Sequence, residues 1–219
     1  MCGRFTLHLS PELIAEIFRV PFLADFVPRF NVAPSQSQPV VRQTTEGRQI
    51  VQMKWGLIPH WAQDSRMGYS MINARAESLD VKPAFRGSFH SQRCLVVADG
   101  FYEWRHEGKT KEPFYITLKN GGVMAFAGLW DHWQNQDGEI VESFTIITCD
   151  SNELVSKLHN RMPVVIYQKN YSTWLNPATP LENVKKLLLP YPAERMTLWK
   201  VSSLVNSPKI DSEECIRKA

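Results

Sequence analysis

Seven stretches of the chain concentrate β-branched and aromatic residues over lengths typical of strands, and turn-forming residues separate them. Seven strands are too many for one flat layer in a chain of this size, so the pattern predicts a twisted or closed sheet. The predicted strands cover residues 49–55, 93–104, 113–119, 123–130, 143–149, 163–167 and 196–202.

Three shorter stretches carry helical signals. The first covers residues 10–19, where Ser10 is a suitable N-cap and a proline follows it. A second helix is expected from Ser151 to about His159, and a third over residues 181–189. These helices are too few and too short to form a layer of their own, so we expect them at the periphery of the sheet.

The connections between these elements are also predicted. Residues 21–39 contain four prolines and few periodic apolar positions, which favours an irregular segment that wraps over the core. The Asn120–Gly122 turn should join strands 113–119 and 123–130 as a hairpin. The pattern as a whole predicts an α+β fold, with a mainly antiparallel or barrel-like core, in a single domain that spans residues 1–219.

The amino-acid composition narrows the classes of protein to which this chain can belong. Hydrophobic residues make up 43% of the chain and charged residues 21%, and apolar runs such as 123–130 are far too short to cross a bilayer. The N-terminus lacks the basic and long apolar segments of a secretory signal, so we expect a cytoplasmic protein that makes no membrane contact. The four cysteines are widely spaced, which predicts neither a metal site nor a disulfide framework, and no cofactor motif is present.

Charge and aromatic content permit a nucleic-acid partner. The formal net charge is +3, below the strongly basic balance of dedicated duplex-binding proteins. Seven tryptophans, six tyrosines and eleven phenylalanines provide many flat rings that could stack on bases, although aromatic residues more often belong to the core. Composition alone therefore leaves the partner open.

Cys2 offers unusual chemistry if Met1 is removed. An α-amino group titrates near 7.7–8.0 and is neutral at pH 7 roughly several hundred times more often than a lysine side chain. A neutral amine attacks aldehydes, and the adjacent thiol can trap the resulting imine as a five-membered thiazolidine. Gly3 leaves room for a ligand. The alternative is that Cys2 is a small buried apolar residue near the terminus.

Other polar residues lie in positions that suit a reactive site. Asn73 and Arg75 are two apart, so in an extended segment they lie on one side and could hold a sugar hydroxyl and a phosphate. Glu103 lies among aromatic residues at the end of a predicted strand, where a raised pKa would suit proton transfer. His159 is expected at a helix end, whose dipole favours protonation. Trp61 follows a proline turn and could stack on a base, although a tryptophan in such a segment, taken alone, more often belongs to the core.

Six segments, read together, closely resemble the SOS-response-associated peptidase (SRAP) family, whose members process abasic sites in DNA. The resemblance follows the family's order and covers nearly all of the chain. It rests on the segments MCGRFT at 1–6, FNVAPSQ at 30–36, WGLIPHW at 55–61, MINARAE at 71–77, CLVVADGFYEW at 94–104 and LHNRMPVVI at 158–166, with VSSLVNSPK at 201–209 similar to the family's closing segment.

The resemblance implies a set of site residues. Cys2 corresponds to the N-terminal nucleophile, assisted by residues that match Asn73, Glu103 and His159. One departure is that Asn160 stands where family members commonly carry an aspartate beside this histidine. The implied contacts to single-stranded DNA are Arg4, Pro34, Trp61, Arg75, Trp104 and Thr148.

The resulting hypothesis is a monomeric protein that senses abasic sites in single-stranded DNA and crosslinks to them through Cys2 by lyase-type imine chemistry. Two other functions stay open at this point. One is a cysteine peptidase that acts through Cys2, with self-removal of a short leader as its minimal form. The other is a non-covalent binder of single-stranded or modified DNA.

Overall fold

The strands form two sheets in the computed structural model, which describes residues 2–21, 26–108 and 110–219. The sheets share one hydrophobic core, so the fold is α+β as predicted. The smaller sheet has five strands in the order β12 (Met196–Lys200), β8 (Thr110–Leu118), β7 (Gly100–Glu107), β1 (Phe5–Leu7) and β2 (Arg29–Val32).

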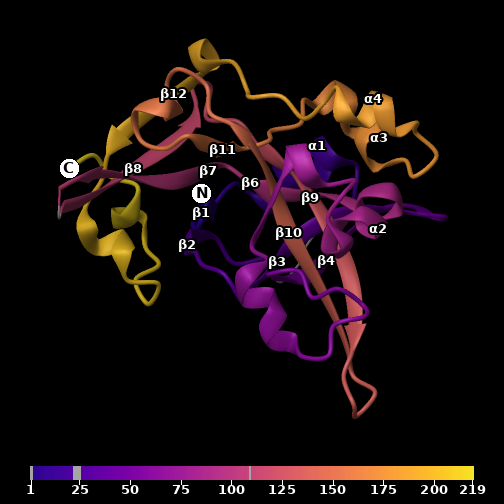
Figure 1. The fold of residues 1–219 in the computed structure, drawn as a ribbon. Helices are drawn as coiled ribbons and strands as arrows, with labels where there is room; N and C mark the ends of the chain where they lie inside the picture. The colour runs from indigo at the N-terminus through magenta and orange to yellow at the C-terminus, as the bar shows by residue number, and fades with distance from the viewer. Residues whose placement is uncertain (1, 22–25, 109) are drawn as a thin grey trace.

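The larger sheet closes on itself, because β9 pairs with β6 on one edge and with β10 on the other. The predicted barrel-like core is therefore confirmed, and the β9–β10 hairpin extends well beyond it (Figure 1). The ring runs through β10 (Ile140–Asp150), β4 (Gly47–Trp55), β3 (Ser37–Thr44), β6 (Arg93–Ala98) and β9 (Met124–Gln134), while β5 (Asn73–Arg75) and β11 (Arg161–Pro163) pair with β10 outside it.

Short helices lie around the sheets (Figure 1). The first begins as predicted, because the Ser10 side chain accepts a hydrogen bond from the Leu13 amide. The α-helices in the described part of the chain are α1 (Pro11–Phe18), α2 (Pro83–Ser91), α3 (Tyr171–Leu175) and α4 (Leu181–Lys185). The 3₁₀ turns are Ser65–Ser70, Ala76–Ser78, Val155–Lys157, Gln168–Asn170, Ala193–Arg195, Ser203–Asn206 and Glu213–Cys215.

Two predictions for helices were wrong in length or type. The stretch expected to be helical from Ser151 to His159 contains only the 3₁₀ turn Val155–Lys157, and it is Asn152 that accepts hydrogen bonds from the following backbone amides. The helix expected over 181–189 ends at Lys185. Tertiary contacts take the place of further helical turns in both segments, because the 3₁₀ turn Val155–Lys157 packs against β11 and α4 packs against α3.

The stretch 93–104, predicted as one strand, is two strands in different sheets. β6 ends at Ala98 and β7 begins at Gly100, so the chain crosses from the larger to the smaller sheet at Asp99. Gly100 is required there, because a Cβ atom would lie 2.2 Å from the Tyr115 hydroxyl oxygen. The uninterrupted apolar pattern concealed this crossing.

The Asn120–Gly122 turn also changes sheets, so the predicted hairpin was wrong. β8 belongs to the smaller sheet and β9 to the larger one, and β9 pairs with β10 instead.

The expectation of an irregular 21–39 segment was wrong for β2 and for the start of β3, while residues 22–25 lie outside the described residues. Pro39 is tolerated because β6 pairs with β3 only from Val40 onward.

Asp99 ties the N-terminal strand to the point where the two sheets meet. Its carboxylate accepts hydrogen bonds from the Thr6 hydroxyl and from the amides of His8 and Leu9, and it lies 2.6 Å from His8 Nδ1. The side chain is 2% exposed. Because β1 begins three residues after Cys2, these bonds fix the start of the chain against the core.

We expect Asp99→Ala to lower the free energy of unfolding by roughly 3 kcal/mol, because the Thr6 hydroxyl and the His8 and Leu9 amides lose their acceptor. Urea unfolding followed by tryptophan fluorescence measures the change. Asp137→Ala, which removes an exposed carboxylate in the β9–β10 turn, is the control and should change stability by about 0.5 kcal/mol or less. Equal losses in the two variants would contradict the role of Asp99.

Candidate functional site

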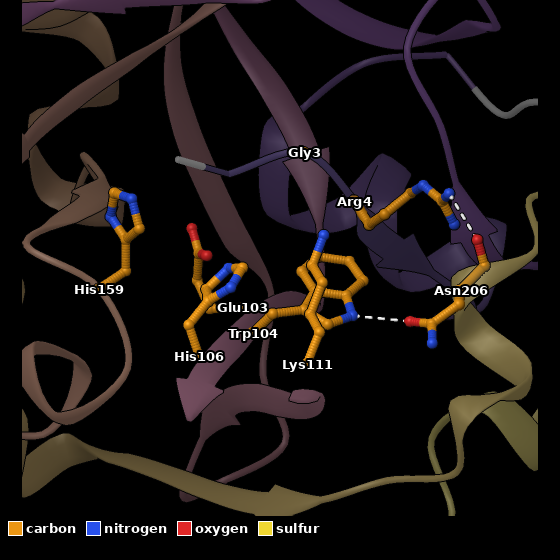
Figure 2. Close-up of a pocket in the computed structure, with 8 residues that line it drawn as sticks. All are labelled: Gly3, Arg4, Glu103, Trp104, His106, Lys111, His159 and Asn206. Carbon is orange, nitrogen blue, oxygen red and sulfur yellow. Dashed lines mark hydrogen bonds between the residues drawn. The ribbon is translucent and has the colours of Figure 1, made fainter. Parts of the chain in front are cut away.

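A cleft of about 540 Å³ lies between β7, the start of the chain and the loop before β11. Figure 2 shows that segments far apart in the sequence contribute its walls. The lining residues are Gly3, Arg4, Glu103, Trp104, His106, Lys111, His159 and Asn206.

Cys2 is completely buried beside this cleft. Its carbonyl oxygen accepts a 2.9 Å hydrogen bond from Asn73 Nδ2, and its Sγ lies 3.9 Å from the Arg4 carbonyl oxygen. Burial, followed by the negative charge of Glu103, raises the pKa of the Cys2 thiol far above its ordinary value. The thiol is therefore protonated at neutral pH in this arrangement, and its burial agrees with both sequence interpretations of Cys2.

Asn73 is held in position by β5, which runs parallel to β10 with Asn73 opposite Ile146. One side of its amide fixes the Cys2 carbonyl. Its Oδ1 atom is buried and has no hydrogen-bond partner among the described residues. A buried amide oxygen in this condition is suited to accept a hydrogen bond from a ligand.

Glu103 lies in the middle of β7, opposite Phe114 on β8, and not at a strand end as the sequence suggested. Its side chain is 3% exposed, and in Figure 2 the carboxylate points upward from the strand. The negative charge of Glu103 is one cause of the raised pKa of the Cys2 thiol, after burial. A carboxylate in this position can take or return a proton during chemistry at Cys2.

His159 does not lie at the end of an α-helix, so the helix dipole expected from the sequence is absent. A three-residue 3₁₀ turn precedes it, and its own amide donates to the Val155 carbonyl. The Arg161 amide donates to His159 Nδ1 at 2.9 Å. This bond makes Nε2 the protonated nitrogen of the neutral ring, which orients the side chain as a proton donor.

Arg4 has a different environment from that expected of a simple phosphate contact. Its guanidinium donates to Asn31 Oδ1 at 2.7 Å and to the carbonyl oxygens of Val205 and Asn206 at 2.8 and 3.3 Å. Partial burial lowers the pKa of this guanidinium. Arg4 therefore links the start of the chain to the C-terminal segment while it lines the cleft.

Trp104 lies on the cleft wall between two residues that the sequence did not single out. Its Nε1 donates to Asn206 Oδ1 at 2.7 Å, and Lys111 Nζ lies 4.9 Å from the ring centroid (Figure 2). His106 lies two residues along the strand from Trp104 and opposite Lys111. The alternation of Trp104 and His106 on β7 is a signal that could have identified this wall.

The other four predicted DNA contacts do not line this cleft. Trp61 is 49% exposed in the turn after β4, and Pro34 lies half-buried between β2 and β3. Arg75 is exposed and lines a second hollow with Asp150 and other polar residues. Thr148 is completely buried, and its hydroxyl lies 3.4 Å from the Ala74 carbonyl oxygen.

Within the described ranges, no group of three or more histidine, cysteine, aspartate or glutamate side chains is arranged to hold a metal ion. None of the helices in the described part of the chain is long and apolar enough to cross a membrane.

Comparisons with known proteins agree on one family. The family model described as "SOS response associated peptidase (SRAP)" matches residues 1–208. Abasic site processing protein YoqW of Bacillus subtilis is 45% identical over 221 residues, with 99% of each chain covered. Abasic site processing protein HMCES of Xenopus tropicalis is 31% identical over 262 residues, with 99% of this chain and 78% of its own covered.

Solved structures show the same fold. A crystal structure of a protein from Bacteroides thetaiotaomicron superposes with a TM-score of 0.90 at 27% identity, covering 100% of both chains. A protein from Bordetella bronchiseptica gives a TM-score of 0.80 at 26% identity, covering 92% of this chain and 100% of its own.

We expect Glu103→Gln to increase the alkylation rate of Cys2 at a given pH. The negative charge of Glu103 raises the pKa of the Cys2 thiol, so removal of this charge should lower that pKa. For each pH unit by which the pKa falls, the fraction of Cys2 present as thiolate rises about tenfold. Iodoacetamide labelling across pH, mapped to Cys2 by mass spectrometry, measures the effect. Glu46→Gln, an exposed control, should leave the rate unchanged, and an unchanged rate in Glu103→Gln would refute the electrostatic coupling.

Proposed function

The chain belongs to the SOS response associated peptidase (SRAP) family, and from this membership and the geometry of the cleft we propose that it processes abasic sites in DNA through Cys2. The observation that carries the proposal is the position of Cys2. Its carbonyl is held by Asn73, and its thiol is coupled to Glu103 in the wall of a cleft that also contains His159.

The proposed reaction uses the ring-opened aldehyde of an abasic deoxyribose. After Met1 is removed, the α-amine of Cys2 adds to the aldehyde carbon, and loss of water gives an imine. The thiol sulfur then adds to the imine carbon while the nitrogen gains a proton, which closes a thiazolidine and consumes no further reactant. The DNA strand and the protein are thereby joined through one carbon atom.

Proton transfer explains why a carboxylate and an imidazole lie beside a buried thiol. The raised pKa of Cys2 means that the thiol must lose its proton during ring closure and not before it. In this proposal Glu103 accepts protons during imine formation and carries one from sulfur to nitrogen during closure. His159, whose neutral ring carries its proton on Nε2, is proposed to donate to a sugar oxygen, and Asn73 Oδ1 to accept from a sugar hydroxyl.

Binding of the strand is proposed to depend on the cleft walls and the neighbouring surface. Lys111 supplies an exposed positive charge beside the Trp104 ring, which suits a backbone phosphate next to a stacked base. Arg75 supplies a second exposed charge at the end of β5. The modest net charge of +3, together with the abundant aromatic residues, supports a preference for single-stranded DNA over duplex. We propose that the protein acts as a cytoplasmic monomer in the response to DNA damage.

A peptidase function is the second candidate, and the family description favours it. In this reaction the Cys2 thiolate attacks a peptide carbonyl, with His159 as the base; self-removal of a leader is the minimal form. The buried, protonated thiol is unfavourable for such an attack, since a thiol nucleophile acts as the thiolate. A peptidase does not need the α-amine of Cys2, so blocking that amine separates the two reactions.

We expect Cys2→Ala to abolish the heat-stable crosslink to an abasic single-stranded oligonucleotide, because the sulfur that closes the ring is absent. The variant retains an α-amine, so borohydride should still trap an imine. Denaturing gel electrophoresis with and without borohydride measures both products. Cys149→Ala removes another buried cysteine and should crosslink normally. A heat-stable adduct at wild-type yield in Cys2→Ala would end the proposal.

We also expect undamaged single strands to bind more tightly than duplex of the same sequence, and both affinities to fall as salt rises. Lys111→Glu should weaken single-strand binding several-fold, because it places a negative charge beside Trp104. Fluorescence anisotropy gives the affinities, with Lys209→Glu as an exposed control away from the cleft lining. Tighter binding to duplex, or equal effects of the two substitutions, would count against this binding mode.

A further inference from the structure

The turn at residues 58–62 carries two exposed rings outside the cleft. It follows β4, and the Ala62 amide closes it by donating to the Pro59 carbonyl at 2.8 Å. Trp61 is 49% exposed, and the side chain of His60 is 64% exposed. Neither ring lines the cleft. Aromatic and ionisable side chains that are exposed on a surface turn are available to a ligand.

Side chains from β9 and β10 fix the backbone of this turn at three points. Because the main chain on both sides of Trp61 is tied to the larger sheet, the turn is ordered before any ligand binds, which lowers the entropy that binding costs. The bonds join the Ile58 amide to Ser143 Oγ at 2.8 Å, the His60 amide to Asp131 Oδ2 at 3.0 Å and the Ala62 carbonyl to Trp133 Nε1 at 2.6 Å.

The Asp131 carboxylate also decides which nitrogen of the His60 ring faces a ligand. Its Oδ2 atom lies 3.0 Å from His60 Nδ1, and Asp131 is 3% exposed. A carboxylate only accepts hydrogen bonds, so Nδ1 carries a hydrogen in the neutral ring and in the charged ring. The second proton of the charged ring is therefore on Nε2, which has no hydrogen-bond partner within the described ranges. His60 can thus donate to a ligand only when its ring is doubly protonated.

Other charged groups lie on the elements around the turn. His132 is the second histidine at Asp131, because its amide donates to Oδ1 at 2.9 Å and its Nδ1 lies 3.8 Å from the same oxygen. Histidine is the side chain whose charge ordinarily changes between about pH 5 and pH 8, so His132 is the matched control for His60. Further charged groups are Lys54, which lies opposite Ser143, and the ion pairs Arg42–Glu142 and Arg66–Asp64.

We propose that His60 is a further DNA-binding residue, an inference that rests on the proposed function because single-stranded DNA is the partner. The doubly protonated ring donates from Nε2 to a backbone phosphate, and the base of the same nucleotide stacks on Trp61. This charge-assisted hydrogen bond is lost when Nε2 gives up its proton. Asp131 is a positioning residue, since it holds both the amide and the ring of His60. Because neither His60 nor Trp61 lines the cleft, the contact holds a nucleotide that flanks the lesion.

The test uses the full chain and a fluorescent thymidine oligonucleotide of about twelve nucleotides, which carries no abasic site and therefore no aldehyde for Cys2. Fluorescence anisotropy at constant salt should show that His60→Gln binds about fivefold more weakly than the wild type at about pH 6, and equally at about pH 8. The two proteins are compared at each pH because the cleft contains histidines of its own. His132→Gln should bind as the wild type does at both pH values.

Two further measurements locate the contact. The loss caused by His60→Gln at about pH 6 should shrink by about twofold or more in a Trp61→Ala background, because the two residues hold one nucleotide. In NMR spectra of the wild type at about pH 7, saturating oligonucleotide should shift the His60 Nε2 resonance towards that of the doubly protonated ring and leave the His132 ring unchanged.

The outcomes separate this proposal from its alternatives. An equal loss in His60→Gln at both pH values, or an unmoved Nε2 resonance, would overturn it. An equal loss in His132→Gln would also overturn it, because the charge around Asp131 would then govern binding without a contact at Nε2. An undiminished His60→Gln loss in the Trp61→Ala background would rule out a shared nucleotide. Failure of the wild type to crosslink abasic DNA would overturn the proposed reaction at Cys2 alone, since these oligonucleotides contain no aldehyde.

Discussion

The buried carboxylate of Asp99 is the constraint on which the position of the site depends. The chain leaves the barrel-like sheet at this residue and enters the smaller sheet, and the same carboxylate receives the Thr6 hydroxyl and the amides after β1. A buried charge is tolerated only when several donors surround it. These donors come from the N-terminal strand, so satisfying Asp99 also fixes the residues that follow Cys2. The reactive terminus is thereby anchored a few residues from its end.

The C-terminal segment provides a second anchor. Asn31 is completely buried, and its amide accepts from Arg4 while it donates to the carbonyls of Val205, Ser207 and Ile210. The 3₁₀ turn Ser203–Asn206 is therefore held against the start of the chain, and Asn206 reaches Trp104 in the cleft (Figure 2). The ends of the chain, distant in sequence, form two walls of one site.

The electrostatics of this site favour a reaction that begins at nitrogen. A thiol that is buried beside a carboxylate keeps its proton, which disfavours sulfur as the first nucleophile. An α-amine at the same residue is neutral in an appreciable fraction of molecules at pH 7. The proposed order of imine formation followed by ring closure rests on this environment of Cys2, with Glu103 proposed to carry the proton from sulfur to nitrogen during closure.

Local signals in the sequence determined several features correctly. The capping of α1 by Ser10 follows from a local signal, and so do strands β4, β8, β9, β10 and β12, because periodicity and capping act over a few residues. The chemistry of Cys2 also follows from covalent structure alone, because an N-terminal cysteine carries its amine and thiol on adjacent carbons. The motifs around Asn73, Glu103 and His159 identified the family and the candidate site before any geometry was known.

Only the tertiary structure decided how these pieces meet. Apolar strands look alike whether they pair within one sheet or pass between two, so the crossing at Asp99 and the change of sheet after Asn120 could not be predicted. The same limit applies to His159, whose environment is set by the Arg161 amide and not by a helix. Lys111 and Asn206 gained their place beside Trp104 from strand register and from packing of the C-terminal segment. Such contacts join residues far apart in the chain, and their energies depend on burial and geometry that no local pattern contains.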